Sequence, residues 1–190
     1  MKTGRPIQVN EMKIPSIRLM AMTALLVLSA GIAAAANSPQ HAVGSGPDDW
    51  WISYPDQRAD GGNAVTHPDW ILDTLQDRPV IIYGHKECPW CPPQEEAVKK
   101  LVGEHESEIE YFDIWVDGRD SRYVDLVNYD PNGEGQYVPF TIILTLVRDD
   151  DGRVRVGWHS AEEVTGEEWV RSYVEDAITY YDQNAGSWER

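Results

Sequence analysis

The two cysteines of the chain stand close together, as Cys88-Pro89-Trp90-Cys91. Two cysteines separated by two residues can close a small disulfide ring and reopen it when a thiolate attacks one sulfur. The pair follows the apolar run Val80-Ile81-Ile82-Tyr83, which is typical of a buried strand. The spacing is therefore compatible with a redox dithiol, a structural disulfide or part of a metal site.

Each of these three interpretations makes a different demand on the sequence. A structural disulfide is disfavoured, because chain-entropy stabilisation grows with loop length and this loop is very short. A copper or zinc site would draw on His85-x-x-Cys88-x-x-Cys91, with His105 or His159 as a fourth ligand. A single Cys-x-x-Cys is half of a usual zinc site, so redox chemistry is favoured and metal binding is the alternative.

The composition limits the kind of partner. The chain has 190 residues, enough for one domain with a real core, and it carries 16 basic against 32 acidic residues. Nucleic acids and anionic membrane surfaces would repel such a protein. We therefore expect no nucleic-acid partner.

The first 36 residues differ in composition from the rest. Lys2, Arg5, Lys13 and Arg18 precede an uncharged stretch, residues 19–36, which ends in four alanines. A basic flank, an apolar segment and small residues are typical of a secretory signal peptide. The alternative is an uncleaved membrane tether, because 18 uncharged residues are near the lower limit for a span. Both interpretations place the folded part outside the cytoplasm.

The remaining chain divides into an extension, a domain and a tail. Residues 37–64 are rich in turn and linker residues and are predicted to form an extension that docks through Trp50-Trp51, covering an edge of the domain. The domain is predicted over 65–183, and residues 184–190 are predicted to form a C-terminal tail.

Within the domain, hydrophobic periodicity and turn signals predict alternating helices and strands. The expected order is a helix capped by Thr66, a strand 80–83, a helix 94–106, an internal strand 109–117, a short helix 121–129, a strand 137–146, a hairpin turn 150–152, a strand 154–158 and a helix begun by Thr165 that runs to Tyr181. This order predicts an α/β fold with a mixed sheet of about four to five strands and helices on both faces.

A strand, then Cys-Pro-aromatic-Cys at the head of a helix, and later Val138-Pro139 opening another strand resemble the thioredoxin superfamily over residues 65–183. The resemblance implies that the Val138-Pro139 bond is cis and that its loop packs against the dithiol. It also implies that Cys88 is the attacking thiolate and Cys91 the resolving thiol. Pro89, Trp90, Val138 and Pro139 would then position the substrate, with Trp90 exposed between the cysteines.

Three positions depart from the pattern of that family or invite a second interpretation. Ile82 occupies the place where thioredoxins hold a buried acid six residues before the first cysteine. Pro92-Pro93 are expected to delay the regular helix until after Pro93, since each proline lacks an N–H and restricts the residue before it. His159 is expected to be a surface or capping residue and not part of the site.

These observations predict an exported thiol–disulfide oxidoreductase without an organic cofactor. Its partners would be cysteine-containing substrate proteins and a redox partner protein. The alternative function is that of a non-catalytic copper or zinc carrier or chaperone that uses His85, Cys88 and Cys91. A pure interaction module is disfavoured, because both cysteines are present together with Val138-Pro139.

Overall fold

The structure, a computed structural model, describes residue 1 and residues 38–190. The expected signal peptide or membrane tether, with its apolar stretch 19–36, lies outside the described residues. Residues 38–190 belong to one compact unit. No helix in this described part of the chain is long and apolar enough to cross a membrane.

A four-stranded mixed sheet forms the centre of the domain. Its strands are β1 (Val80–His85), β2 (Glu110–Trp115), β3 (Phe140–Arg148) and β4 (Val154–Ala161), in the order β2-β1-β3-β4. β1 runs parallel to β2 and antiparallel to β3, and β3 runs antiparallel to β4. The predicted hairpin between β3 and β4 is confirmed, with a turn in which the Gly152 N–H donates to the Asp149 carbonyl.

The prediction that residues 109–117 form an internal strand is wrong, because β2 pairs only with β1 and lies at an edge of the sheet. Its central residue Ile114 is buried, whereas Tyr111 and Phe112 are only partly buried. The apolar content of this strand therefore reflects what covers its two faces and not how many strands flank it.

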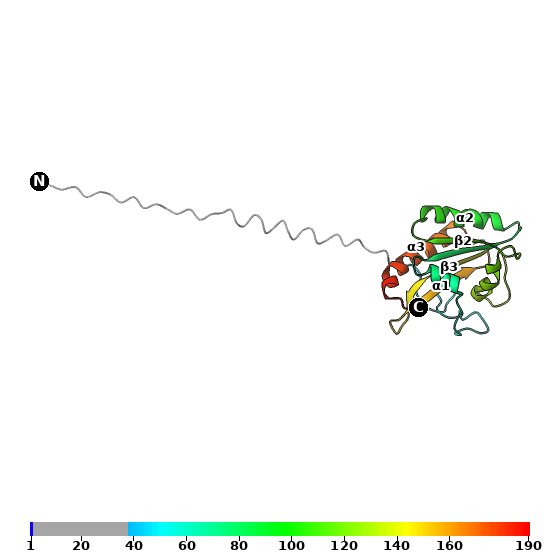
Figure 1. Cartoon of the computed structure of the whole chain (residues 1–190), viewed down its shortest axis with the longest axis horizontal. Helices are drawn as coiled ribbons and strands as arrows, with labels where there is room; N and C mark the ends of the chain where they lie inside the picture. Colours follow the sequence, from blue (N-terminus) through cyan, green and yellow to red (C-terminus); the bar gives the residue numbers. More distant parts are fainter. Residues whose placement is uncertain (2–37) are drawn as a thin grey trace. The chain divides into compact units, whose positions relative to one another are not determined.

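Helices cover both faces of the sheet, as predicted, and the α/β fold class is confirmed. On one face lie α1 (Asp69–Thr74) and η1, a 3₁₀ helix (Ser121–Tyr129); on the other lie α2 (Cys91–Glu104) and α3 (Glu167–Asn184). α2 and α1 are seen on opposite sides of the sheet in Figure 1. β1 serves both cores by strict alternation, with Val80 and Ile82 facing the α1 side and Ile81 and Tyr83 the α2 side. The last turn of the chain is a short 3₁₀ helix, η2 (Ala185–Ser187).

The first helix starts later than predicted. α1 begins at Asp69, its N-cap is Pro68 in an extended conformation, and no side chain caps it. Thr66 is therefore not the cap. Proline disfavours helical geometry in the residue before it, so His67 is excluded from the helix and Thr66 lies too far upstream to cap it.

The extension 38–64 packs on the domain through its tryptophan pair. Trp51 and Trp158 of β4 exchange two backbone hydrogen bonds of 2.9 Å, so that the extension lies along the free edge of β4. Trp50 and Trp51 are fully buried, each in the core of a different face. Covering an edge strand in this way protects it from pairing with another chain.

The C-terminal residues also contact the domain. Trp188 packs against the core on the α1 side, and Arg190 pairs with the carboxylates of Asp69 and Asp73 in α1.

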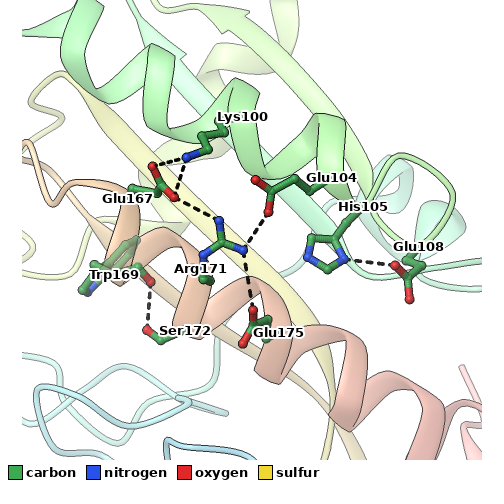
Figure 2. A network of polar contacts seen from close by, with 9 residues as sticks. All are labelled: Lys100, Glu104, His105, Glu108, Glu167, Trp169, Arg171, Ser172 and Glu175. Atoms are coloured by element: carbon green, nitrogen blue, oxygen red, sulfur yellow. Dashed lines mark hydrogen bonds and ion pairs between the residues drawn. The ribbon is translucent and has the colours of Figure 1, made fainter.

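A network of ion pairs joins α2 to α3 (Figure 2). Lys100 of α2 lies 2.8 Å from a Glu167 oxygen, and Arg171 of α3 bonds Glu104 at 2.7 Å and Glu167 at 3.0 Å. The hydrogen bonds to Glu104 and Glu167 raise the pKa of Arg171, and those to Arg171 and Lys100 lower the pKa values of the two carboxylates. Partly exposed pairs of this kind contribute little singly, but the network fixes α2, which carries Cys91, beside α3.

Candidate functional site

Cys88 and Cys91 form a disulfide at the end of β1, with their Cα atoms 5.5 Å apart. Cys91 is the first residue of α2 and is only 3% exposed, whereas Cys88, in the preceding loop, is partly exposed. A partner thiolate can therefore approach Cys88 from solvent, while Cys91 is shielded. This asymmetry is the one expected of an attacked and a leaving sulfur.

The prediction that α2 begins only after Pro93 is wrong. The helix begins at Cys91, with Trp90 as its N-cap and both prolines in its first turn. The reason is that first-turn N–H groups have no partner within a helix, so prolines there remove no hydrogen bond, and their φ is already helical. Cys91 therefore stands at a true helix N-terminus, where the helix dipole favours a thiolate.

The loop before β3 lies at the same end of the sheet as the dithiol. The Val138–Pro139 peptide bond is cis, and Pro139 is buried. Phe140, the next residue, pairs with Gly84 of β1, four residues before Cys88. The sheet register thus brings this loop and the cysteine-bearing loop together.

Two large side chains project from these loops into solvent. Trp90, between the cysteines, is 69% exposed, and Tyr137, directly before Val138, is 60% exposed. Pro89 is exposed as well. Exposed aromatic side chains are common where a protein binds another polypeptide. Tyr137 was not predicted as a site residue, although an aromatic residue beside Val138-Pro139 was a usable signal.

Tyr83 and His85 lie beneath the dithiol on the α2 face of β1. The Tyr83 hydroxyl donates to the Cys91 carbonyl at 2.6 Å, and its ring stacks on His85 with the centroids 5.1 Å apart. Burial, reinforced by the charges of Glu95 and Asp113, raises the pKa of Tyr83, so its hydroxyl stays protonated and able to donate. Ile82, in the position of the absent acid, points into the opposite core.

The residues of the metal hypothesis do not converge in this part of the chain. The His85 ring bonds the Asp113 carboxylate of β2, and His105 bonds Glu108. Between residues 38 and 190, no cluster of three or more histidine, cysteine or acidic side chains is placed to hold a metal ion.

Gln94, one turn into α2, is fully buried and ties three elements together. Its Nε2 donates to the hydroxyls of Thr141 in β3 and Thr165 before α3, each at 3.0 Å. Its Oε1 accepts from the Thr165 and Gly166 N–H groups, at 2.9 and 3.3 Å. The predicted cap by Thr165 is wrong: the N-cap of α3 is Gly166, no side chain caps the helix, and Gln94 Oε1 binds the two N–H groups just before it.

Replacing Gln94 with leucine is expected to lower the free energy of unfolding by about 2–3 kcal/mol, because two N–H groups at the start of α3 and the Thr141 hydroxyl lose their buried partners. Urea denaturation of the oxidised protein measures the effect. Gln76→Leu, the same change at an exposed position, is the control and should stay within about 0.5 kcal/mol of the parent. Equal losses in the two variants would contradict this role of Gln94.

His159 is not a surface residue, contrary to the prediction, because it is 3% exposed. Its ring lies between Trp51 and Tyr173, with centroid distances of 4.2 and 4.1 Å, and its Nδ1 is 2.8 Å from the Asp49 carbonyl oxygen. Burial lowers the pKa of His159 to about 4. Trp51 and Asp49 belong to the extension. Sequence periodicity does not show where the extension packs on β4, so it could not predict that His159 is buried.

Glu162 follows β4 and accepts the Tyr137 N–H at 2.9 Å, beside the Val138–Pro139 loop. Burial raises its pKa to about 7, and the charges of Asp130 and Glu134 act in the same direction. The folded protein therefore holds a proton on Glu162 that the unfolded chain, with the usual pKa of 4.5, releases earlier. Stability from this residue is present below pH 4.5 and is lost as the pH rises through 7.

Glu162→Gln is therefore expected to raise the thermal unfolding midpoint relative to the parent above pH 7, and this gain should shrink toward pH 4.5. Scanning calorimetry across this range measures the difference. Glu163→Gln removes the same charge from an exposed neighbouring position and controls for the change in net charge. A gain from Glu162→Gln that does not vary with pH would refute the assignment.

Comparison with protein-family models and with curated proteins finds no match for the chain. The class of protein is therefore defined by the structure alone: an α/β domain with an open four-stranded mixed sheet and a disulfide of Cys-x-x-Cys spacing at the start of a helix.

Proposed function

We propose that this protein is a thiol–disulfide oxidoreductase of the thioredoxin superfamily that exchanges disulfides with cysteines of other proteins. The observation that carries the proposal is the unequal exposure of Cys88 and Cys91 at the start of α2. The Val138–Pro139 loop, which the sheet register brings to the same end of the sheet as the dithiol, supports it further. Trp90, Pro89, Val138 and Pro139 would position the substrate chain.

The oxidising half-reaction begins when a substrate thiolate attacks Sγ of Cys88. The Cys88–Cys91 bond breaks, Cys91 leaves with the electron pair as a thiolate, and a mixed disulfide joins Cys88 to the substrate. A second substrate thiolate then attacks the substrate sulfur of that mixed disulfide and releases Cys88 as a thiolate. The substrate loses two electrons and the protein gains them; the reverse sequence reduces a substrate disulfide.

We propose further that the domain works outside the cytoplasm, either secreted or tethered to a membrane. The basic flank and the apolar stretch 19–36 support this location, where thiols of client proteins are oxidised. The proposed partners are cysteine-containing substrate proteins and a redox protein that regenerates the starting state of the dithiol.

The reduction potential of the pair tests the proposal. The full chain is equilibrated in glutathione buffers of graded ratio, and mass spectrometry after thiol alkylation counts reduced molecules. We expect a two-electron transition between about −120 and −270 mV, the range of disulfide exchange proteins. A pair that remains oxidised at about −300 mV would instead be a structural disulfide.

A further inference from the structure

An open hollow of about 670 Å³ lies beyond the end of β4. The extension, the segment after η1 and the segment that joins β4 to α3 build its walls. The side chains that matter most for its chemistry are those of Asp48, Trp51, His159, Glu162, Glu163 and Trp169.

The side chains that line the hollow are acidic and not basic. Three of its lining residues, Asp48, Glu162 and Glu163, are carboxylates, and none of the described residues that line it is a lysine or an arginine. Trp169, which is partly exposed, also lines it, whereas the neighbouring Trp51 is fully buried. Carboxylates combined with indole rings attract an ammonium or guanidinium group both by charge and by cation–π interaction.

His159 supplies an independent sign of a ligand. The Asp49 carbonyl can only accept a hydrogen bond, so the Nδ1 atom 2.8 Å away carries the proton of the neutral ring. Trp51 and Tyr173 stack against the ring of His159, which lines the hollow, so only an edge of the ring can meet a ligand there. The hydrogen bond that the structure shows for the His159 ring is the one at Nδ1, so Nε2 is an acceptor that a ligand in the hollow can use.

A ligand that fills the hollow should therefore bring both N–H donors and positive charge. The neutral state of the ring fits this requirement, because burial holds the pKa of His159 at about 4 and Nε2 remains an acceptor near neutral pH. Lysine and arginine side chains carry donors and charge on long apolar stems that can cross the aromatic walls.

The hollow and the dithiol lie at the same end of the sheet, because the one follows the end of β4 and the other the end of β1. Tyr83 of β1, Thr141 of β3 and Ala161 of β4 lie side by side in register. Two strand spacings place β4 about 10 Å from β1, a distance that an extended peptide spans in about three residues. Glu162, next after Ala161, is hydrogen-bonded to the backbone of Tyr137 in the loop that faces the dithiol.

We propose that this hollow binds a lysine or arginine side chain of the substrate protein, about three residues from the cysteine that exchanges with Cys88. The inference rests on the proposed function and names its substrate class, proteins with a basic residue near the reactive cysteine. Asp48 and Glu163 would supply the charge, Glu162 would add to it as the pH rises through about 7, and His159 would supply a fixed hydrogen-bond acceptor.

Peptides of otherwise identical sequence test this inference. Each holds one cysteine and, three positions to either side, lysine, glutamine or glutamate. Stopped-flow fluorescence measures their rate of attack on the oxidised full chain, and each rate is divided by the rate of the same peptide with glutathione disulfide. On one side of the cysteine, lysine should exceed glutamine by about tenfold and glutamate should be slowest, as for a charge-assisted hydrogen bond.

The double variant Glu162→Gln, Glu163→Gln should bring the lysine-to-glutamine ratio close to one. The control variant Glu106→Gln, Glu189→Gln removes two exposed charges outside the hollow and should retain the ratio of the parent. Equal rates for lysine and glutamate peptides in the parent, or an unchanged ratio in the double variant, would overturn the inference.

A binding measurement separates this inference from the proposed function. Matching peptides with serine in place of cysteine are titrated into the protein, and nuclear magnetic resonance follows the indole N–H signal of Trp169. Preference for the lysine peptide without any disulfide exchange would support the hollow and refute the redox function. Exchange without preference would do the reverse.

Discussion

Cys88→Ser is expected to abolish disulfide exchange, leaving only the rate of the uncatalysed reaction. The remaining Cys91 is 3% exposed and begins α2, so a substrate disulfide cannot reach its sulfur without opening the helix start. A serine hydroxyl is neither a sulfur that can be attacked nor a thiolate that can attack. Reduction of a disulfide-bonded reporter protein, followed by its fluorescence, measures the rate.

The matched control for this variant is Ser107→Cys in the Cys88→Ser background, which restores the number of cysteines at an exposed position beyond the C-terminal end of α2, away from the dithiol. It should not restore exchange above that of a free thiol. Full activity of Cys88→Ser alone would contradict the assignment of Cys88 as the attacking residue.

Trp51→Ala is expected to lower the free energy of unfolding by about 3–5 kcal/mol, the usual cost of removing a fully buried large aromatic side chain. Trp51 packs edge-on against Trp158, with the centroids 4.9 Å apart, and its Nε1 donates to the Gly46 carbonyl at 2.7 Å. The substitution would therefore open a cavity between the extension and β4. Chemical denaturation of the oxidised protein measures the change.

Trp90→Ala is the control for the same change of residue type, because Trp90 is 69% exposed. Its effect on stability should remain within about 0.5 kcal/mol. A small effect of Trp51→Ala, comparable with that of Trp90→Ala, would mean that the extension is not part of the folded core.

The elements with strong local signals were predictable. The apolar runs of β1 and β3 indicate buried strands, and the periodic apolar face of α3 indicates a helix. The structure confirms both, because these elements bury those residues in the two cores. The position of the dithiol followed from the spacing of Cys88 and Cys91, whereas its interpretation as a redox site also depended on Val138-Pro139. Local pattern and tertiary structure agree at these places.

The features that sequence reasoning missed depend on contacts between distant residues. Gln94 accepts a hydrogen bond from the N–H of Gly166, which lies 72 positions later in the chain, and no local pattern records such a partner. The edge position of β2 is a matter of strand order, which apolar content does not specify. The burial of His159 depends on Trp51 from the extension, 108 residues earlier, which the sequence alone did not place.

The wrong prediction of where α2 begins has a local cause, the two prolines after Cys91. Each proline lacks an N–H and restricts the residue before it, but the first turn of a helix tolerates proline because its N–H groups have no partner within the helix. The structure places Pro92 and Pro93 in that turn. The helix N-terminus therefore remains available to stabilise a thiolate at the dithiol.

Trapping of a mixed disulfide tests the central claim most directly. Cys91→Ser in the full chain is incubated with a disulfide-bonded reporter protein, and intact mass spectrometry searches for a covalent adduct. The account predicts an adduct through Cys88 that persists, because the resolving thiol is absent, and no adduct with Cys88→Ser. Adducts of equal yield on both variants, or on neither, would contradict it.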